Sequence, residues 1–88
     1  MKISTKGRYG LRAVIELASC PPEKYIPLGC IAQQQKISLN YLEHSFSALK
    51  KAGLVIGLSG VQGGYKLAKN PSDITLKDVL DVLEGDLS

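Results

Sequence analysis

Apolar residues recur at helical spacing between residues 38 and 52. The large apolar side chains that share one side of this segment are Leu39, Leu42, Phe46 and Leu49. The other side carries polar groups of several kinds. This pattern predicts a helix with one face in a core and a chemically varied face outside it. Ser38 is placed to cap the first turn of the helix, and Gly53 to end it.

The spacing changes to a period of two directly after this helix. Leu54, Ile56 and Leu58 alternate along residues 54–58, which predicts a strand whose core-facing side carries these three side chains. Residues 65–68 are the expected partner strand. The loop between the strands, residues 59–64, contains three glycines that allow positive φ angles and close backbone approach. A β-hairpin is therefore expected.

Two more helices are expected before residue 38. The first covers residues 6–19, with a broad apolar face, so that only the stripe Arg8, Arg12 and Glu16 faces water. The apolar face consists of Tyr9, Leu11, Ala13, Val14, Ile15, Leu17 and Ala18. A pair of prolines ends this helix and leaves residues 22–27 as an exposed connection. A short helix then runs from Pro27 to residue 35, with Gln33 to Gln35 on its outer side.

A fourth helix is expected near the end of the chain. Thr75 and Asp78 have the spacing of a capping box, in which each residue's side chain accepts from the other's backbone N–H. The buried stripe of this helix is expected to be Leu76, Val79, Leu80 and Leu83. The sequence thus predicts a mainly α fold with a small β-hairpin. Its form would be a winged helix-turn-helix, with a three-helix core, a wing at 54–69 and a fourth helix, in one domain over residues 1–88.

Charge is unevenly distributed along the chain. The net charge is +4 over residues 1–12 and +3 over residues 13–69, against −4 over residues 70–88. This segregation favours a polyanionic partner for the basic part. No apolar run approaches the ~20 residues of a membrane-spanning helix. The polar, basic start lacks the apolar region of a secretory signal, so we expect a cytoplasmic protein with no membrane partner.

Few residues are suited to catalysis or metal binding. His44 is the only histidine, and Cys20 and Cys30 do not form a CxxC pair. The glycine-containing segment at residues 59–66 has the spacing of neither a P-loop nor a dinucleotide-binding fingerprint. We therefore expect no enzyme activity and no metal site in this chain.

The polar face of the 38–52 helix suits DNA better. Asn40 can pair with adenine, and Glu43 can accept from the amino group of cytosine. Basic side chains around this helix would contact phosphates and position the protein without specifying sequence. These are Lys2, Lys6, Arg8, Lys50, Lys51 and Lys66.

Several motifs resemble those of one known family. They are MKISTKGRYGL at the start, IS-x-x-YLE-x-x-F-x-x-L at residues 37–49, KAGLV at 51–55 and GGY at 63–65. Together they resemble the Rrf-two (Rrf2) family of bacterial repressors at nearly constant spacing over almost the whole chain, and the opening run is most similar to CymR-like members. The resemblance implies a winged-helix domain that binds a palindromic double-stranded DNA operator as a homodimer.

The resemblance also implies which residues contact the DNA. The N-terminal contacts are Ser4, Thr5, Lys6 and Tyr9. The contacts on the recognition helix are Ser38, Asn40, Tyr41, Glu43, His44 and Ser47, to which we add Lys50 as a phosphate contact. The contacts on the wing are Ser59, Gly60, Gln62, Gly63 and Gly64.

The chain departs from the family pattern at three places. Ser59 stands where many members have an arginine that enters the minor groove, so the wing is expected to bind more weakly, with Gln62 as a partial substitute. Lys36 stands where some members have glycine, and a positive φ there would cost on the order of 1 kcal/mol. The family continues into a cysteine-bearing loop and a dimerisation helix. In the family, the iron–sulfur ligands and the usual dimer interface lie in that continuation, beyond the position of Ser88, so the resemblance implies no cofactor within this chain. The chain is expected to be either a DNA-binding fragment or a short member of the family with altered assembly.

Two other functions are compatible with these residues. A winged helix that no longer reads DNA and instead docks on a protein partner is favoured by the missing arginine and dimerisation helix. A redox sensor that uses Cys20 or Cys30 is the other.

Overall fold

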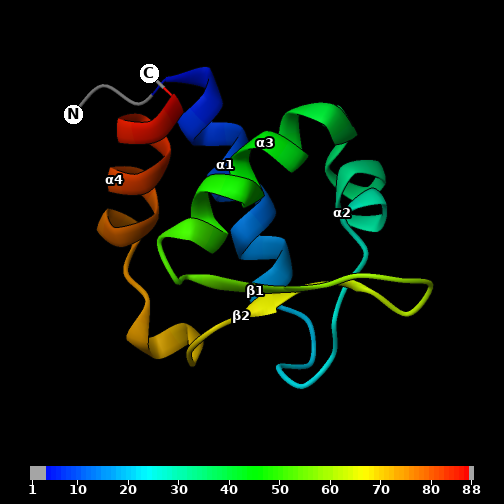
Figure 1. Ribbon diagram of the computed structural model, residues 1–88. Helices are drawn as coiled ribbons and strands as arrows, with labels where there is room; N and C mark the ends of the chain where they lie inside the picture. Colours follow the sequence, from blue (N-terminus) through cyan, green and yellow to red (C-terminus); the bar gives the residue numbers. More distant parts are fainter. Residues whose placement is uncertain (1–3, 88) are drawn as a thin grey trace.

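The computed structural model describes residues 4–87, which form four α-helices and one β-hairpin (Figure 1). The elements in chain order are α1 (Thr5–Ala18), α2 (Leu28–Gln35), α3 (Leu39–Lys51), β1 (Val55–Leu58), β2 (Gly64–Leu67), the short 3-10 helix η1 (Pro71–Asp73) and α4 (Leu76–Leu87). The two strands pair antiparallel, with Val55 opposite Leu67 and Leu58 opposite Gly64. This is the expected winged helix-turn-helix with a fourth helix.

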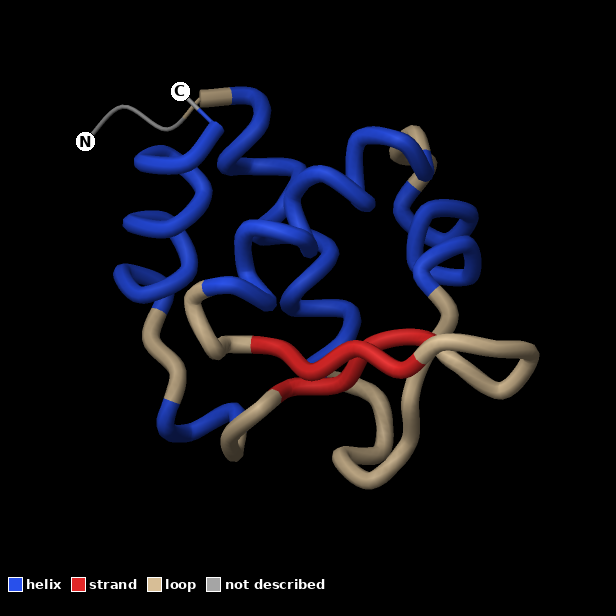
Figure 2. The backbone as a smooth tube through the Cα atoms, viewed as in Figure 1, coloured by secondary structure: helices blue, strands red, loops and turns tan. Residues whose placement is uncertain are grey.

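The helices lie on one side of the hairpin, as Figure 2 shows. α4 packs against both α1 and α3, while α2 lies at the other end of the bundle (Figure 1). The largest fully buried side chains are those of Ile31, Leu42, Ser45, Phe46, Leu49 and Leu83. The core therefore lies between the inner side of α3 and the other three helices. Within the described range of residues 4–87, no helix is long and apolar enough to cross a membrane.

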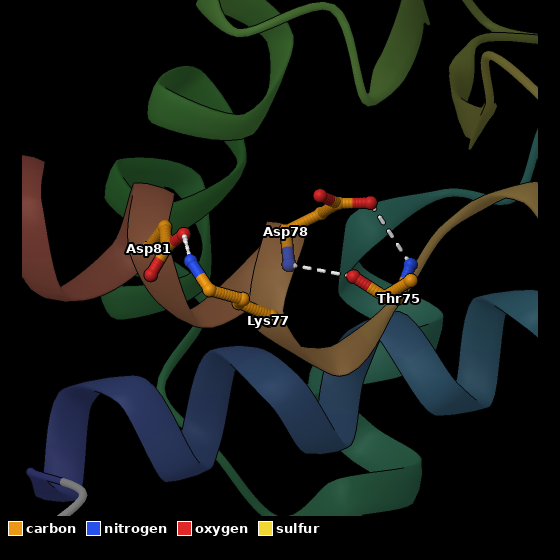
Figure 3. A network of polar contacts seen from close by, with 4 residues as sticks. All are labelled: Thr75, Lys77, Asp78 and Asp81. Atoms are coloured by element: carbon orange, nitrogen blue, oxygen red, sulfur yellow. Dashed lines mark hydrogen bonds and ion pairs between the residues drawn. The ribbon is translucent and has the colours of Figure 1, made fainter.

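The helix ends follow the signals in the sequence. The Ser38 hydroxyl accepts from the backbone N–H of Tyr41 at 3.4 Å, and Gly53 ends α3 with a φ of 79°. Thr75 and Asp78 form the expected capping box, with both hydrogen bonds at 3.0 Å (Figure 3). Lys36 ends α2 in the left-handed conformation, with a φ of 56°. The positive φ considered for this lysine is thus present.

Three residues expected in the core are instead partly exposed. Ile15 is 52% exposed, Leu39 44% and Leu76 60%. Leu39 and Leu76 each begin a helix, so their side chains lie at the edge of the bundle beyond the layer that contacts the core. Ser45, for which no environment is predicted, is completely buried, and its hydroxyl donates to the carbonyl of Tyr41 at 3.3 Å, which satisfies the polar group.

The face assigned to the first strand was also wrong. Val55 is 3% exposed, whereas Ile56 and Leu58 are 40% and 48% exposed. Leu54 is buried but precedes the strand, and its carbonyl accepts from Ala68 at 3.0 Å. A period of two shows that the faces differ but does not show which one meets the core. Here Val55, which begins the strand, joins Leu54 in the core, whereas Ile56 and Leu58 do not.

The connection after α1 is not simply exposed. Ile26 is half-buried and exchanges two backbone hydrogen bonds with Tyr65 of β2, at 2.8 and 2.9 Å. The segment before α2 thereby adds a short bridge to the edge of the hairpin. The wing and the start of the helix-turn-helix are consequently tied together.

Candidate nucleic-acid interface

An open hollow of about 540 Å³ lies along the outer face of α3. It is lined by seven residues, all of them expected contacts: Lys6, Ser38, Asn40, Tyr41, Glu43, His44 and Ser47. All except the half-buried Tyr41 are exposed. The fold therefore brings the polar side of α3 and the beginning of α1 to one concave surface.

Two aromatic pairs hold α3 in its orientation. Tyr41 meets Tyr9 of α1 edge to face, with ring centroids 5.7 Å apart. Phe46 meets Tyr65 of β2 in the same way at 5.1 Å. Burial, and to a smaller extent the neighbouring Tyr9, raise the pKa of Tyr41, so its hydroxyl keeps its proton at neutral pH and can donate a hydrogen bond.

The helix-turn-helix turn is clamped by two residues of α1. Arg12 donates to the side-chain oxygen of Gln35 at 3.2 Å and to its backbone carbonyl at 2.8 Å. The amide of Gln35 donates to Glu16 at 2.7 Å. Arg12 is exposed, as the sequence predicts, whereas Glu16 and Gln35, which are also predicted to face water, are half-buried in this clamp. Only contacts between distant parts of the chain reveal this clamp.

The N-terminal contacts have different surroundings. Thr5 is exposed at the first position of α1, and Tyr9 is half-buried against Tyr41. The Ser4 hydroxyl caps α1 by accepting from Gly7 at 3.0 Å, and it donates to Glu84 at 3.0 Å. Lys2 lies outside the described residues. The sequence offers Ser4 or Thr5 as the N-cap of this helix, and Ser4 takes that role. Its bond to Glu84 has no signal in the local sequence.

The wing tip is shaped by its glycines. Gly60 has a φ of 104° and accepts a hydrogen bond from Gly63 at 3.0 Å, which closes a turn with Val61 and Gln62 at its centre. Gly63 does not have a positive φ; it is required because a Cβ atom there would overlap the carbonyl of Leu58. Val61 and Gln62 are consequently the outermost, exposed side chains of the wing.

Gly64 joins the wing to the segment before α2. Its φ is 149°, and a Cβ atom there would overlap the backbone of Ile26. Close approach was expected at this glycine, but the backbone that approaches it belongs to the chain itself. Glycine is therefore needed at residue 64 for the fold, whatever else this residue contacts.

A second hollow of about 330 Å³ separates α3 from the wing. Glu43 lines both hollows, and Lys50 lines this one together with Ser59, Gly60, Gly63 and Gly64. Of the contacts implied by the resemblance, together with Lys50, only Ser4, Thr5, Tyr9 and Gln62 line neither hollow. The further phosphate contacts Arg8 and Lys51 also line neither. Lys66 lies apart from both, with its ammonium group 4.8 Å from the ring centre of Tyr25.

Metal-binding groups are not brought together in the part of the chain that the structure describes. Among these residues no three His, Cys, Asp or Glu side chains gather where they could hold a metal ion. Cys30 is exposed, and the Cys20 thiol donates to the carbonyl of Glu16 at 3.4 Å. The described residues do not fit an iron–sulfur cluster, and we assign no step to one.

The arrangement of three helices, a turn of residues 36–38 and a hairpin defines a winged helix-turn-helix protein of the DNA-binding type. Comparison with known families agrees: the model of the Rrf2 family, described as an iron-dependent transcriptional regulator, matches residues 3–88. The chain belongs to the Rrf2 family, and the resemblance seen in its motifs is confirmed.

Named relatives support the same assignment. The HTH-type transcriptional regulator CymR of Bacillus subtilis (strain 168) is 50% identical over 88 residues, which cover 100% of this chain and 64% of that protein. The regulator IscR of Aliivibrio salmonicida (strain LFI1238) is 42% identical over 84 residues, which cover 96% of this chain and 50% of that protein. The chain therefore spans between half and two thirds of the length of these relatives.

Solved structures match closely as well. The structure of CymR (YrzC), the global cysteine regulator of B. subtilis, has a TM-score of 0.91 and 49% identity, covering 97% of this chain and 66% of that one. T. potens IscR has a TM-score of 0.87 and 46% identity, covering 100% of this chain and 64% of that one. Both levels of identity are high enough to relate more than the fold.

Proposed function

We propose that this chain is the DNA-reading part of a sequence-specific transcriptional repressor. In this proposal α3 enters the major groove, and the wing of β1, β2 and their loop lies on the adjacent backbone or in the minor groove. The observation that carries the proposal is the hollow along α3, where all seven lining residues have polar side chains. If the polar face of α3 served only to contact water, it would not need to form a concave surface together with α1.

Specificity is assigned to the exposed side chains in the middle of α3. Asn40 can bond two atoms of adenine, Glu43 can accept from cytosine, and His44 and Ser47 offer further donors and acceptors. Each good base contact is typically worth about 1–3 kcal/mol of discrimination. Because the Tyr9–Tyr41 and Phe46–Tyr65 pairs fix α3 relative to α1 and the wing, these side chains would reach the bases from a preset direction.

Affinity is assigned to basic groups around the two hollows. Lys6 borders the first hollow, and Lys50 borders the second. They would contact phosphates on either side of the groove, which positions the protein but carries no sequence information. Ser59 at the wing supplies no charge, so the wing is expected to contribute less to affinity than α3.

Assembly and location extend this proposal beyond the described residues. We propose a homodimer on a palindromic operator in the cytoplasm, with the two α3 helices in successive major grooves about 34–36 Å apart. The structure describes one copy of the chain, and one copy covers a half-site.

Binding-site selection tests the proposal. A random-sequence duplex library is enriched with this chain, and the selected duplex and a scrambled version of it are titrated by fluorescence anisotropy over a range of salt concentrations. We expect a clear preference for the selected duplex, with log affinity falling by about 0.9 for each phosphate contact per decade of salt. Equal affinity for both duplexes, or no binding at low salt, would contradict it and favour a protein-docking module.

A further inference from the structure

The N-terminus of α1 lacks one half of its local capping motif. In a capping box, the N-cap hydroxyl accepts from the backbone N–H three residues later, and the side chain at that third position accepts from the N-cap N–H. Ser4 is the N-cap, and its hydroxyl accepts from Gly7 at 3.0 Å. Gly7 has no side chain to return the bond, so the sequence around α1 leaves the Ser4 N–H without its usual partner.

Glu84 of α4 supplies the missing acceptor. One carboxylate oxygen of Glu84 accepts from the Ser4 backbone N–H at 2.9 Å and from the Ser4 hydroxyl at 3.0 Å. The result is a capping box closed by a residue 80 positions away. The start of α4 shows the local version of the same motif, with Thr75 and Asp78 bonded to each other (Figure 3). The chain thus uses the motif twice, once locally and once across the fold.

Charge and packing support the same contact. The first turn of α1 has no acidic residue of its own, so Glu84 brings a negative charge to the positive end of that helix dipole. One turn further along α1, Gly10 is packed so closely against Leu83 that a Cβ atom there would overlap it. Figure 1 shows the last turns of α4 beside the first turn of α1. The beginning of α1 is therefore set by the end of α4.

We infer that Glu84 is a positioning residue for DNA binding. It holds Ser4 and the first turn of α1, and that turn presents Lys6 to the hollow along α3. The inference rests on the proposed function, because it matters for binding only if this turn contacts DNA. Glu84 lines neither hollow, so its proposed effect on binding acts through Ser4, whose backbone N–H and hydroxyl both donate to it.

The expected effect follows from the population of the ordered turn. When a binding-competent state is present in only a fraction of molecules, the apparent affinity falls by that fraction. Loss of an N-terminal cap changes the equilibrium of a helix end by about fivefold. Removing the Glu84 carboxylate should therefore weaken operator binding by up to about fivefold, and the full factor applies when the ordered turn becomes the minor state. The salt dependence should stay the same, because the bound complex still contacts the same phosphates.

Three variants of this chain separate positioning from charge. Glu84→Ala removes the acceptor, Glu84→Gln keeps an acceptor oxygen without the charge, and Asp78→Ala removes an equal charge and the local capping box of α4. Binding is measured on the duplex selected by the wild-type chain and on its scrambled version, with the salt slope for each. Hydrogen exchange of the Gly7 amide, which donates to Ser4, is measured in the same proteins without DNA.

We expect Glu84→Ala to bind the selected duplex more than twofold and up to about fivefold more weakly at an unchanged salt slope, with faster exchange at Gly7. Glu84→Gln and Asp78→Ala should remain within about twofold of the wild type in both measurements. Three results would each overturn the inference. Glu84→Ala could bind as tightly as Asp78→Ala, its salt slope could be reduced by about one unit, or Glu84→Gln could bind as weakly as Glu84→Ala. If the wild type prefers neither duplex, the proposed function fails. Independently of DNA, unchanged hydrogen exchange at Gly7 in Glu84→Ala would refute the role of the Glu84–Ser4 contact.

Discussion

Replacing Lys36 by glycine should stabilise the fold. Lys36 lies between α2 and α3 with φ 56° and ψ 46°, close to the ideal left-handed conformation. The next residue, Ile37, donates its backbone N–H to the carbonyl of Ala32 at 3.0 Å, so the turn has the hydrogen bonding of a Schellman motif. Glycine is the usual residue at this position because it has no Cβ atom to crowd the following carbonyl.

The size of the effect is the difference between two terms. A non-glycine residue in the left-handed region costs roughly 1–2 kcal/mol. Glycine adds conformational freedom to the unfolded chain, which opposes this gain by about 0.4–1 kcal/mol. We therefore expect Lys36→Gly to raise the free energy of unfolding by about 0.5–1 kcal/mol. For a domain of this size that corresponds to a rise in Tm of about 2–8 °C.

Lys36→Ala is the matched control. It removes the same exposed charge but keeps the Cβ atom, so it should show no comparable gain. Both variants and the wild type are compared by urea and thermal unfolding followed by circular dichroism. If Lys36→Gly is no more stable than Lys36→Ala, the left-handed conformation carries no strain, and the explanation is wrong.

Two further variants test the wing and the fourth helix. Gly63→Ala should destabilise the fold by about 1–3 kcal/mol, because its Cβ atom would overlap the carbonyl of Leu58. Gly29→Ala is the control and should not destabilise the fold, because its Cβ atom meets open space. Equal unfolding midpoints for the two variants would contradict the wing geometry. The hydrogen bond from the Thr75 backbone, followed by that from its side chain, lowers the pKa of Asp78 below its usual 3.8. The ionised Asp78 carboxylate therefore stabilises the folded state fully above pH 3.8, and this stabilisation is lost as the pH falls through the lowered pKa. The difference in unfolding free energy between the wild type and Asp78→Asn, measured at stepwise lower pH, should disappear in that pH range. A difference that stays constant would contradict the capping role of Asp78.

Local signals in the sequence predicted the elements well. The caps at Ser38 and Thr75, the glycine that ends α3 and the change of spacing after residue 53 each depend on a few neighbouring residues. Their physics is short-range, since a side chain bonds a backbone group within one turn. For the same reason the helix-turn-helix order and the wing were predictable.

Contacts between distant segments were not predictable in this way. The bond of Glu84 to Ser4, the clamp on Gln35 and the pairing of Ile26 with Tyr65 join residues that no local pattern relates. The strand face was misassigned for a related reason, because packing against the helices decides which side of an alternating strand is buried. The candidate site residues on α3 follow from helical spacing, whereas the bond of Ser4 to Glu84 and the close approach of Ile26 to Gly64 depend on the tertiary fold.

The base preference of a recognition-helix variant tests the central claim most directly. Libraries with every single-base change in the selected duplex are titrated with the wild type and with Glu43→Ala and Asn40→Ala. If α3 reads the major groove, each variant should lose about 1–3 kcal/mol of discrimination at one or two adjacent positions and keep it elsewhere. Uniformly weaker binding with the same base preferences would mean that these side chains do not read the DNA, and would contradict the account.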